Sequence, residues 1–162
     1  MTSSEATPPA VSAQVTPAET VSPAGGQPIP IEAIDHVALT VSDPARSIRW
    51  YQDTFGFTEA HMEGLAVGPP FILRVVGESY LNLFPPDAGA TQPSPGHDTI
   101  AMRHLAFRVP FALMEQTEQR LREQGHAVKA FAYGPRCRSL FLSDPDGHQI
   151  ELIGYGDGVF VG

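Results

Sequence analysis

The sequence predicts an α+β fold made of two tandem βαβββ modules, and three observations carry that prediction. A strand pattern, a helix pattern and three more strand patterns follow one another after position 30 and again after position 100. Matching features of the two halves recur at one nearly constant offset along the chain. A segment rich in Gly, Pro, Ser and Thr, residues 87–99, is typical of an exposed connector between them. A chain of 162 residues is long enough to bury one ordinary core.

The first module begins with a strand and a capped helix. In the run 34–41, aliphatic residues alternate with a second face that holds His36. Asp43 suits a helix N-cap, Pro44 suits the first helical position, and Gly56 can end the helix in a left-handed conformation. The apolar stripe of this helix is Ile48, Tyr51 and Phe55. Strands are then expected near 58–63, 71–76 and 79–84.

The second module repeats this order. A strand is expected over 102–109, followed by a helix over 110–124 that Gly125 stops. The expected stripe of this helix is Leu113, Thr117 and Leu121. The last three strands are expected near 127–132, 138–143 and 148–154. The run 144–147, Asp-Pro-Asp-Gly, predicts a tight hairpin turn between the last two of them.

Candidate metal ligands occupy matching positions of the repeat. His36 corresponds to His104, and Asn82 corresponds to Glu151, at almost the same offset that relates the helix-ending Gly56 to Gly125. By strand alternation, His36 from the first module and His104 with Glu151 from the second would face a shared cleft. Two imidazoles and one carboxylate suit a divalent ion such as Zn, Mn, Ni or Fe and leave positions open for water or substrate. The alternative is that the histidines are surface residues and that Glu151 faces solvent.

Composition excludes several classes of protein. A formal net charge of −8 and the absence of a basic run argue against a nucleic-acid surface. The single Cys137 excludes an intrachain disulfide framework, and no apolar run is long enough to span a membrane. The segment 1–30 resembles neither a secretory signal nor a transit peptide, so we expect a cytoplasmic protein.

The expected boundaries follow from these patterns. Residues 1–29, rich in Pro, Ser and Ala, are predicted to be a disordered tail. The predicted domain covers residues 30–158, and its parts are module one, 31–86, the linker, 87–99, and module two, 100–155.

Two segments resemble a known family. Residues 36–57, with Trp50-Tyr51 and the triplet Phe-Gly-Phe at 55–57, resemble the first-module signature of the glyoxalase / bleomycin-resistance / dioxygenase superfamily, the vicinal oxygen chelate proteins. Residues 143–151 resemble the closing hairpin of that superfamily with its ligand Glu. The resemblance implies a glyoxalase-like cleft and, by analogy with many two-module relatives, a homodimer. The four metal positions that it implies are His36, Asn82, His104 and Glu151.

Departures from the family pattern bear on the reaction. Glyoxalase I and methylmalonyl-CoA epimerase supply a side-chain ligand where this chain has Asn82, which could still bond a metal-bound water. Extradiol dioxygenases have a Tyr where this chain has Phe141, so ring cleavage is disfavoured. Fosfomycin-resistance transferases have a Thr at the position of Ala38, and an Arg that is absent from residues 154–162.

The remaining candidate site residues would contact the substrate. Arg108 shares the strand face of His104, and Arg136 and Arg138 flank Cys137 ahead of the penultimate strand. Guanidinium groups bind carboxylate or phosphate in a bidentate manner, so this cluster would suit an anionic substrate. Phe141 would add an apolar wall. The alternative, that the arginines are solvated surface charges, stays open.

Two functions are consistent with these residues. The first is a divalent-metal-dependent enzyme that binds vicinal oxygens of a small oxygen-rich substrate, with Glu151 as ligand and, when displaced, as base. The reaction could be that of a lyase, isomerase, transferase or dioxygenase, with a glyoxalase-like lyase favoured. The second is a metal-free small-molecule binding protein of the bleomycin-resistance type. The side chains His, His and Glu at three of four ligand positions favour the enzyme.

Overall fold

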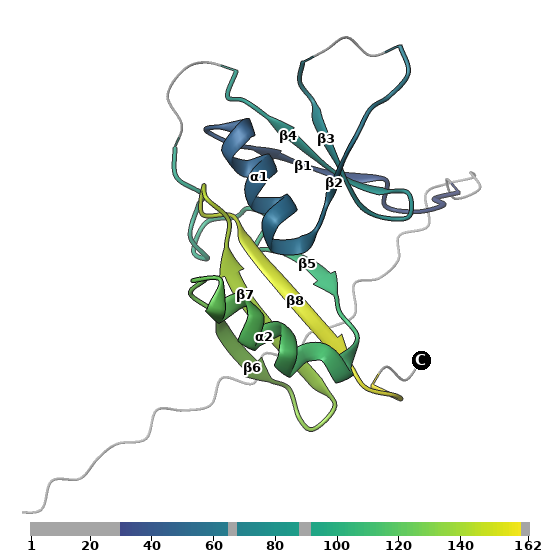
Figure 1. The fold of residues 1–162 in the computed structure, drawn as a ribbon, viewed down its shortest axis with the longest axis vertical. Helices are drawn as coiled ribbons and strands as arrows, with labels where there is room; N and C mark the ends of the chain where they lie inside the picture. Colours follow the sequence, from purple (N-terminus) through teal and green to yellow (C-terminus); the bar gives the residue numbers. More distant parts are fainter. Residues whose placement is uncertain (1–29, 65–67, 88–91, 160–162) are drawn as a thin grey trace, which may run out of the picture. The chain divides into compact units, whose positions relative to one another are not determined.

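Each half of the chain folds into one α-helix and one four-stranded sheet in the computed structural model, which describes residues 30–64, 68–87 and 92–159 (Figure 1). The first half consists of β1 (His36–Thr40), α1 (Pro44–Phe55), β2 (Thr58–Ala60), β3 (Phe71–Val76) and β4 (Ser79–Phe84). The second half consists of β5 (Leu105–Arg108), the 3-10 turn η1 (Phe111–Leu113), α2 (Met114–Glu123), β6 (Lys129–Ala132), β7 (Cys137–Ser143) and β8 (Gln149–Tyr155). This order confirms the predicted pair of βαβββ modules.

Some of the sequence-based boundaries fall outside the described residues. The tail predicted over 1–29 and residues 88–91 of the predicted linker are among them. The chain divides into two units, 1–32 and 33–162, and both sheets belong to the second unit. Among the described residues, no helix is long and apolar enough to cross a membrane.

The two sheets have the same strand order and matching registers. The orders are β1-β4-β3-β2 and β5-β8-β7-β6, with one parallel pair in each sheet, β1 with β4 and β5 with β8. Ala38 lies opposite Asn82 in the first parallel pair, and Ala106 lies opposite Glu151 in the second. The repeat inferred from sequence spacing therefore extends to individual strand partners.

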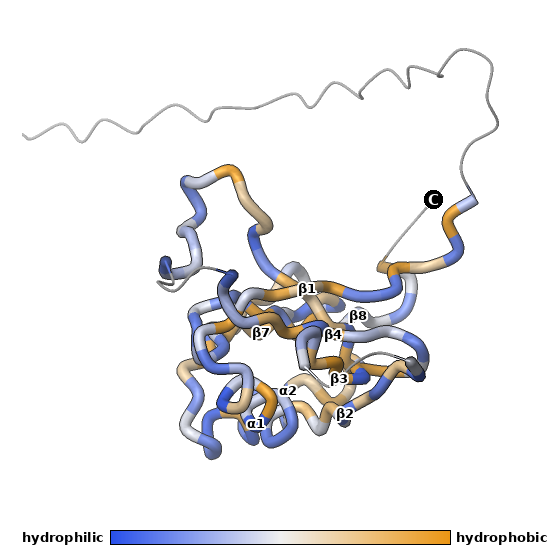
Figure 2. The backbone as a smooth tube through the Cα atoms, turned by 90° about the horizontal axis from the view of Figure 1, so that it is seen from above, coloured by the Kyte–Doolittle hydropathy of each residue, from blue (hydrophilic) through white to orange (hydrophobic). Residues whose placement is uncertain are grey.

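The core lies between the sheets and the two helices. Figure 2 shows α1 and α2 on the same side of β1, β4, β7 and β8. One set of alternating strand residues faces this side and is fully or nearly buried, including Leu39, Leu81, Leu140, Ile150 and Leu152. These residues form one apolar cluster that draws on both modules. The alternate set therefore lies on the helix-free faces, which hold the candidate ligands.

Helix α1 forms as its sequence predicts. The Asp43 side chain accepts a hydrogen bond from the backbone N–H of Arg46, Pro44 opens the helix, and Gly56 closes it at φ 75°. Its most buried residues include two polar ones, Ser47 and Thr54, because the helix packs against the second module as well as its own sheet.

The second helix differs from its prediction in which residues it buries. The 3-10 turn η1 precedes α2, and a 3-10 turn has about three residues per turn rather than 3.6. The buried stripe therefore shifts by one position, so that Met114 is 1% exposed and Leu113 is 46% exposed. Leu121 is buried as expected. Strands β2, β5 and β6 are also shorter than predicted, which places His104 just before β5 rather than inside it.

The hairpin turn between β7 and β8 connects the second module to α1 of the first. The buried Tyr51 hydroxyl donates to Asp144 over 3.0 Å, and the other carboxylate oxygen of Asp144 accepts from the backbone N–H groups of Asp146 and His148. Burial raises the pKa of the Tyr51 hydroxyl, and the neighbouring Asp144 carboxylate raises it further. This tyrosine therefore stays protonated and acts as a hydrogen-bond donor.

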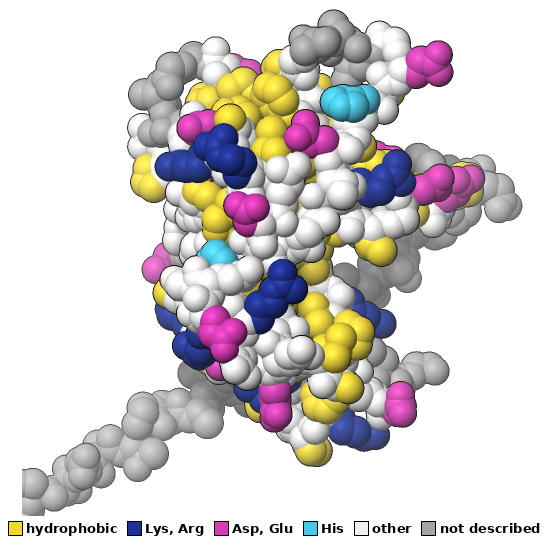
Figure 3. Space-filling view, in the orientation of Figure 1, with side chains coloured by type: hydrophobic (Ala, Val, Ile, Leu, Met, Phe, Trp, Pro, Cys, Tyr) yellow, Lys and Arg dark blue, Asp and Glu magenta, His cyan; other side chains and the backbone are white. Residues whose placement is uncertain are grey.

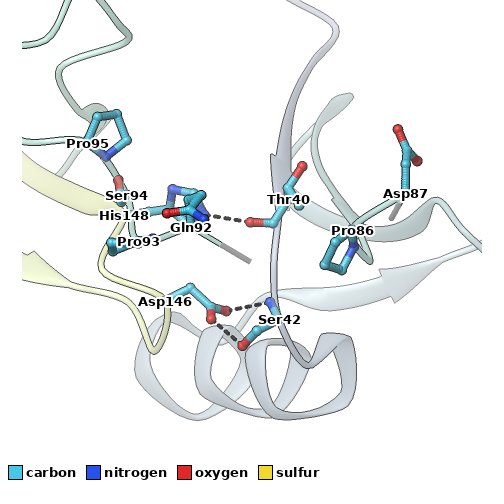
Figure 4. Close-up of a pocket in the computed structure, with 10 residues that line it drawn as sticks. All are labelled: Thr40, Ser42, Pro86, Asp87, Gln92, Pro93, Ser94, Pro95, Asp146 and His148. Atoms are coloured by element: carbon cyan, nitrogen blue, oxygen red, sulfur yellow. Dashed lines mark hydrogen bonds between the residues drawn. The ribbon is translucent and has the colours of Figure 1, made fainter. Parts of the chain in front are cut away.

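A second set of hydrogen bonds continues the same connection (Figure 4). Asp146 accepts from the hydroxyl and backbone N–H of Ser42 and pairs with Arg46 over 2.9 Å. His148 Nε2 lies 2.9 Å from the carbonyl oxygen of Thr40. Burial works to raise the pKa of Asp146, but the hydrogen bonds from Ser42 and the charge of Arg46 lower it overall. The hairpin thus binds the second module to the first through hydrogen bonds and an ion pair.

Gly154 on β8 should be intolerant of a side chain. A Cβ there would lie 2.6 Å from Met114 Cγ and 3.1 Å from the Phe111 backbone, where the second helix meets the sheet. We expect Gly154→Ala to lower the free energy of unfolding by about 1–3 kcal/mol through overpacking. Gly96→Ala is the matched control, because no described atom lies within 4 Å of its Cβ position. Denaturant unfolding of both variants measures this, and equal midpoints would contradict the packing described.

Candidate metal centre

The helix-free face of the second sheet brings two candidate ligands into contact. His104 Nε2 lies 2.9 Å from Glu151 Oε2, and Glu151 is 6% exposed although it is ionisable. The phenyl ring of Phe141, which lies opposite Glu151 in the sheet, packs edge-on against the His104 imidazole at 5.5 Å between centroids. Phe131 packs against Phe141 in turn. The polar His104–Glu151 pair therefore lies beside an aromatic wall, as the alternation of β7 and β8 predicted.

The helix-free face of the first sheet holds the other two candidate positions. His36 and Asn82 line one cavity of about 280 Å³, with Tyr80 and Arg74 beside them. Asn82 is 8% exposed, and its Oδ1 atom has no hydrogen-bond partner among the described residues. A buried amide oxygen without a partner is costly, so its presence beside a histidine points to a missing donor or cation. The Arg74 guanidinium stacks on the Tyr80 ring at 5.2 Å.

Asp35 orients the first histidine. Its carboxylate lies 2.6 Å from Nδ1 of His36, which leaves Nε2 of that ring for a ligand. Histidines that bind metals commonly donate a hydrogen bond from the N–H of their second ring nitrogen to a carboxylate in this way. Sequence reasoning did not single out Asp35, although its place directly before His36 was visible.

The two halves of the candidate centre lie on different sheets of the chain. His36 belongs to the first sheet, whereas His104 and Glu151 belong to or adjoin the second. In residues 30–64, 68–87 and 92–159, no group of three or more His, Cys, Asp or Glu is placed to hold a metal ion. The convergence expected between the modules of a single chain is therefore absent from the described part of this chain.

The three candidate arginines are dispersed. Arg108 remains on the second sheet, where its guanidinium stacks on the Tyr155 ring at 4.9 Å. Arg136 donates to the carbonyl oxygen of Asp157 over 2.6 Å. Arg138 lies on the opposite face of β7 from Phe141, because the two are an odd number of positions apart, and it pairs with Glu118 and Glu115 of α2. The expected three-arginine cluster therefore does not form.

The charged residues of α2 are consistent with this outcome. Hydrogen bonding from Arg122 lowers the pKa of Glu118, and Arg138 lowers it further. On the face shown in Figure 3, basic and acidic side chains are interspersed rather than gathered into a basic patch. Arg138 therefore serves the helix-sheet contact.

Two polar residues beside the centre were not predicted. Gln149 starts β8 two positions before Glu151, and its Oε1 atom lies 2.9 Å from Nε2 of His97. The sequence offered a signal for Gln149, since it repeats the position of Tyr80 on the candidate face. It offered none for His97, which lies in an irregular segment without periodicity.

The donor set fits a divalent metal ion. Neutral imidazole nitrogens and a carboxylate oxygen bind first-row ions such as Zn²⁺ and Mn²⁺, and an amide oxygen can bind the ion or its water. Glu151 is buried beside His104, and the amide oxygen of Asn82 has no described partner beside His36, so each half offers donor atoms suited to a cation. The chemistry of the residues present therefore agrees with a metal centre split over two faces.

The fold and these positions define a family. Residues 33–152 match the Glyoxalase/Bleomycin resistance protein/Dioxygenase superfamily, so the chain belongs to it. This match confirms the resemblance inferred from the two sequence segments.

Individual relatives are distant. Metallothiol transferase FosB of Staphylococcus epidermidis is 27% identical over 127 residues, which cover 75% of this chain and 81% of the relative. A glyoxylase/bleomycin resistance protein/dioxygenase domain from Frankia sp. EAN1pec has a TM-score of 0.66 at 24% identity and covers 80% of this chain and 96% of its own. A mutant of the fosfomycin resistance protein FosX from Listeria monocytogenes, complexed with Mn(II) and 1S,2S-dihydroxypropylphosphonic acid, has a TM-score of 0.61 at 17% identity, covering 78% of this chain and 95% of its own.

Proposed function

We propose that this protein is a divalent-metal-dependent enzyme that acts on a small oxygen-rich substrate by chelation of vicinal oxygens. The observation that carries the proposal is the contact between His104 and Glu151 on a helix-free sheet face. A buried carboxylate against a half-exposed imidazole is unfavourable without a cation or a proton between them. Metal-dependent relatives support the same interpretation, since FosB is named a metallothiol transferase and the FosX structure contains Mn(II).

Each candidate residue would have its own role at such a metal centre. His36, His104 and Glu151 would hold the ion, and Asn82 would bind its water or the substrate. The ion would supply Lewis-acid polarisation of substrate oxygens. Glu151, the buried carboxylate beside His104, would act as a base when displaced from the ion. Arg108, on the same sheet, would bind an anionic group of the substrate.

A second copy of the chain would complete the centre. Because His36 is separated from His104 and Glu151 within the described chain, a ligand from another copy is the simplest way to join the three. β1 and β5, which carry or adjoin the histidines, are both edge strands. A twofold dimer would place each first-module face against a second-module face and so create two equivalent centres.

Exposed apolar side chains flank both half-sites and support this assembly. Ile34, two positions before His36, is 78% exposed, and Met62, which lines the cavity of His36, is also exposed. Met102, two positions before His104, is exposed as well. Apolar residues gathered around polar half-sites are typical of surfaces that a partner covers.

Metal analysis tests the proposal and separates it from a metal-free binding protein. The protein should be purified without a histidine tag and assayed by elemental analysis after dialysis. We expect one tightly held divalent ion per chain. The His36→Ala, Asn82→Ala and Glu151→Ala variants test the ligand set. The proposal would be contradicted if all three variants retained stoichiometric metal, or if the wild-type protein bound no added Zn²⁺ or Mn²⁺.

A further inference from the structure

A second cavity adjoins His104, between the linker and the closing hairpin. It measures about 210 Å³ and is formed by three segments, 94–97, 102–105 and 147–150, with Leu39 at its apolar side. The first segment belongs to the linker between the modules and takes no part in the proposed metal centre. Small cavities formed where several chain segments meet are common ligand sites.

The lining of this cavity differs in charge from the rest of the molecule. The chain carries a formal net charge of −8, yet the described residues that line this cavity include no Asp or Glu. Its polar lining instead includes His97, Arg103, His104 and His148. By contrast, acidic residues line both the cavity drawn in Figure 4 and the cavity of His36. A lining with Arg103 and no carboxylate favours an anion.

The two histidines of this cavity that lie outside the metal centre, His97 and His148, are each held in place by a hydrogen bond. Nε2 of His97 lies 2.9 Å from Gln149 Oε1, and Nε2 of His148 lies 2.9 Å from the carbonyl oxygen of Thr40. Both partners are acceptors, so the hydrogen lies on Nε2 in each ring. Nδ1 of each ring then remains for a second proton and a second partner. Protonation there would turn both rings into cationic donors.

We propose that this cavity binds an oxyanion, a carboxylate, phosphate or sulfate group, through His97, His148 and Arg103. Arg103 supplies a permanent charge and a planar set of donors, and the imidazoles add charge-assisted hydrogen bonds. The charged groups around the rings are Asp98 next to His97 in sequence, Asp144 and Asp146 in the hairpin, and the His104–Glu151 pair. Asp144 and Asp146 are already paired with Tyr51, Ser42 and Arg46.

The cavity also specifies the substrate class of the proposed enzyme. If His104 is a metal ligand, the cavity adjoins the metal centre and would hold the anionic end of the substrate. This role in substrate binding rests on the proposed function, whereas anion binding by the cavity does not. The two are distinguishable because the anion can be titrated into the metal-free protein.

Sulfate is the probe that tests the proposal. It is one of the oxyanions that the proposal names, and it is fully ionised near neutral pH. The full chain, treated with EDTA, should be titrated with sodium sulfate at fixed ionic strength while the histidine ring resonances are followed by NMR. We expect saturable shifts at His97 and His148, because both rings line the cavity that the anion would occupy.

Substitutions establish the location of the bound anion. The double variant His97→Ala/Arg103→Ala should weaken sulfate binding by about tenfold or more, which is the usual effect of losing charged hydrogen bonds. His61→Ala is the matched control, because His61 lines the cavity of His36 and its loss should leave sulfate affinity unchanged. The His126 resonance reports folding, since that ring packs on Trp50. Non-saturating shifts, or an equal loss in the control, would overturn the proposal.

Discussion

The His104→Ala variant is expected to lose bound metal almost completely while keeping its fold. Removal of a residue that only hydrogen-bonds a metal ligand costs about 10–100-fold in affinity, and removal of a ligand itself should exceed that. The substitution also separates the buried Glu151 carboxylate from its partner, which removes the arrangement that would attract the ion. Metal affinity should be measured by competition with a chelator of known strength.

The control for this variant is His61→Ala, in which a histidine outside the proposed ligand set is removed. Wild-type metal affinity in the control shows that the loss is specific to the ligand. Circular dichroism and thermal unfolding of both variants show whether the fold is retained. A folded His104→Ala protein that binds metal as tightly as wild type would remove this histidine from the centre.

The architecture was predictable because it depends on local patterns that repeat. Asp43, Pro44 and Gly56 each have a torsional or hydrogen-bonding preference that fits one place in a helix, and the structure uses all three as expected. The strand faces were predictable for the same reason, since alternation fixes which side each residue takes. Errors arose where local geometry departs from the ideal period. The 3-10 turn before α2 is the example, because it buries Met114 in place of Leu113.

The candidate site was predictable only in part. Alternation placed His104, Glu151 and Phe141 on one face, and the structure brings them into contact. Strand alternation could not tell whether the two faces close on each other within a chain or on a second copy. That outcome depends on contacts between the modules, such as those that Tyr51 of α1 makes with the closing hairpin. These contacts, which also involve Ser42 and Arg46, link positions far apart in the chain, and no sequence period encodes such pairs.

Arginine placement shows a second limit of sequence reasoning. Arg136 and Arg138 flank Cys137 and looked like one cluster, but their partners lie in different parts of the structure. Arg138 pairs with Glu118 of α2, and Arg136 binds a backbone carbonyl beyond β8. The residues of the proposed anion site lie instead in the linker, just before β5 and in the closing hairpin, three segments that the sequence pattern does not bring together.

The proposed sharing of ligands between copies takes His36 from one copy of the chain and His104 with Glu151 from another. It is tested most directly with a mixed dimer of one His36→Ala copy and one His104→Ala copy. The two copies should carry different affinity tags without histidine and be isolated together by sequential purification. If the centre is shared, one of the two sites in the mixed dimer is intact and the other lacks two ligands.

Elemental analysis of that mixed dimer gives the decisive number. We predict one tightly bound divalent ion per pair of chains, although neither variant alone retains metal. If each chain formed its own centre, both centres of the mixed dimer would lack one histidine. A mixed dimer that holds no metal, or a wild-type protein that binds metal as a monomer in sedimentation, would contradict the shared centre.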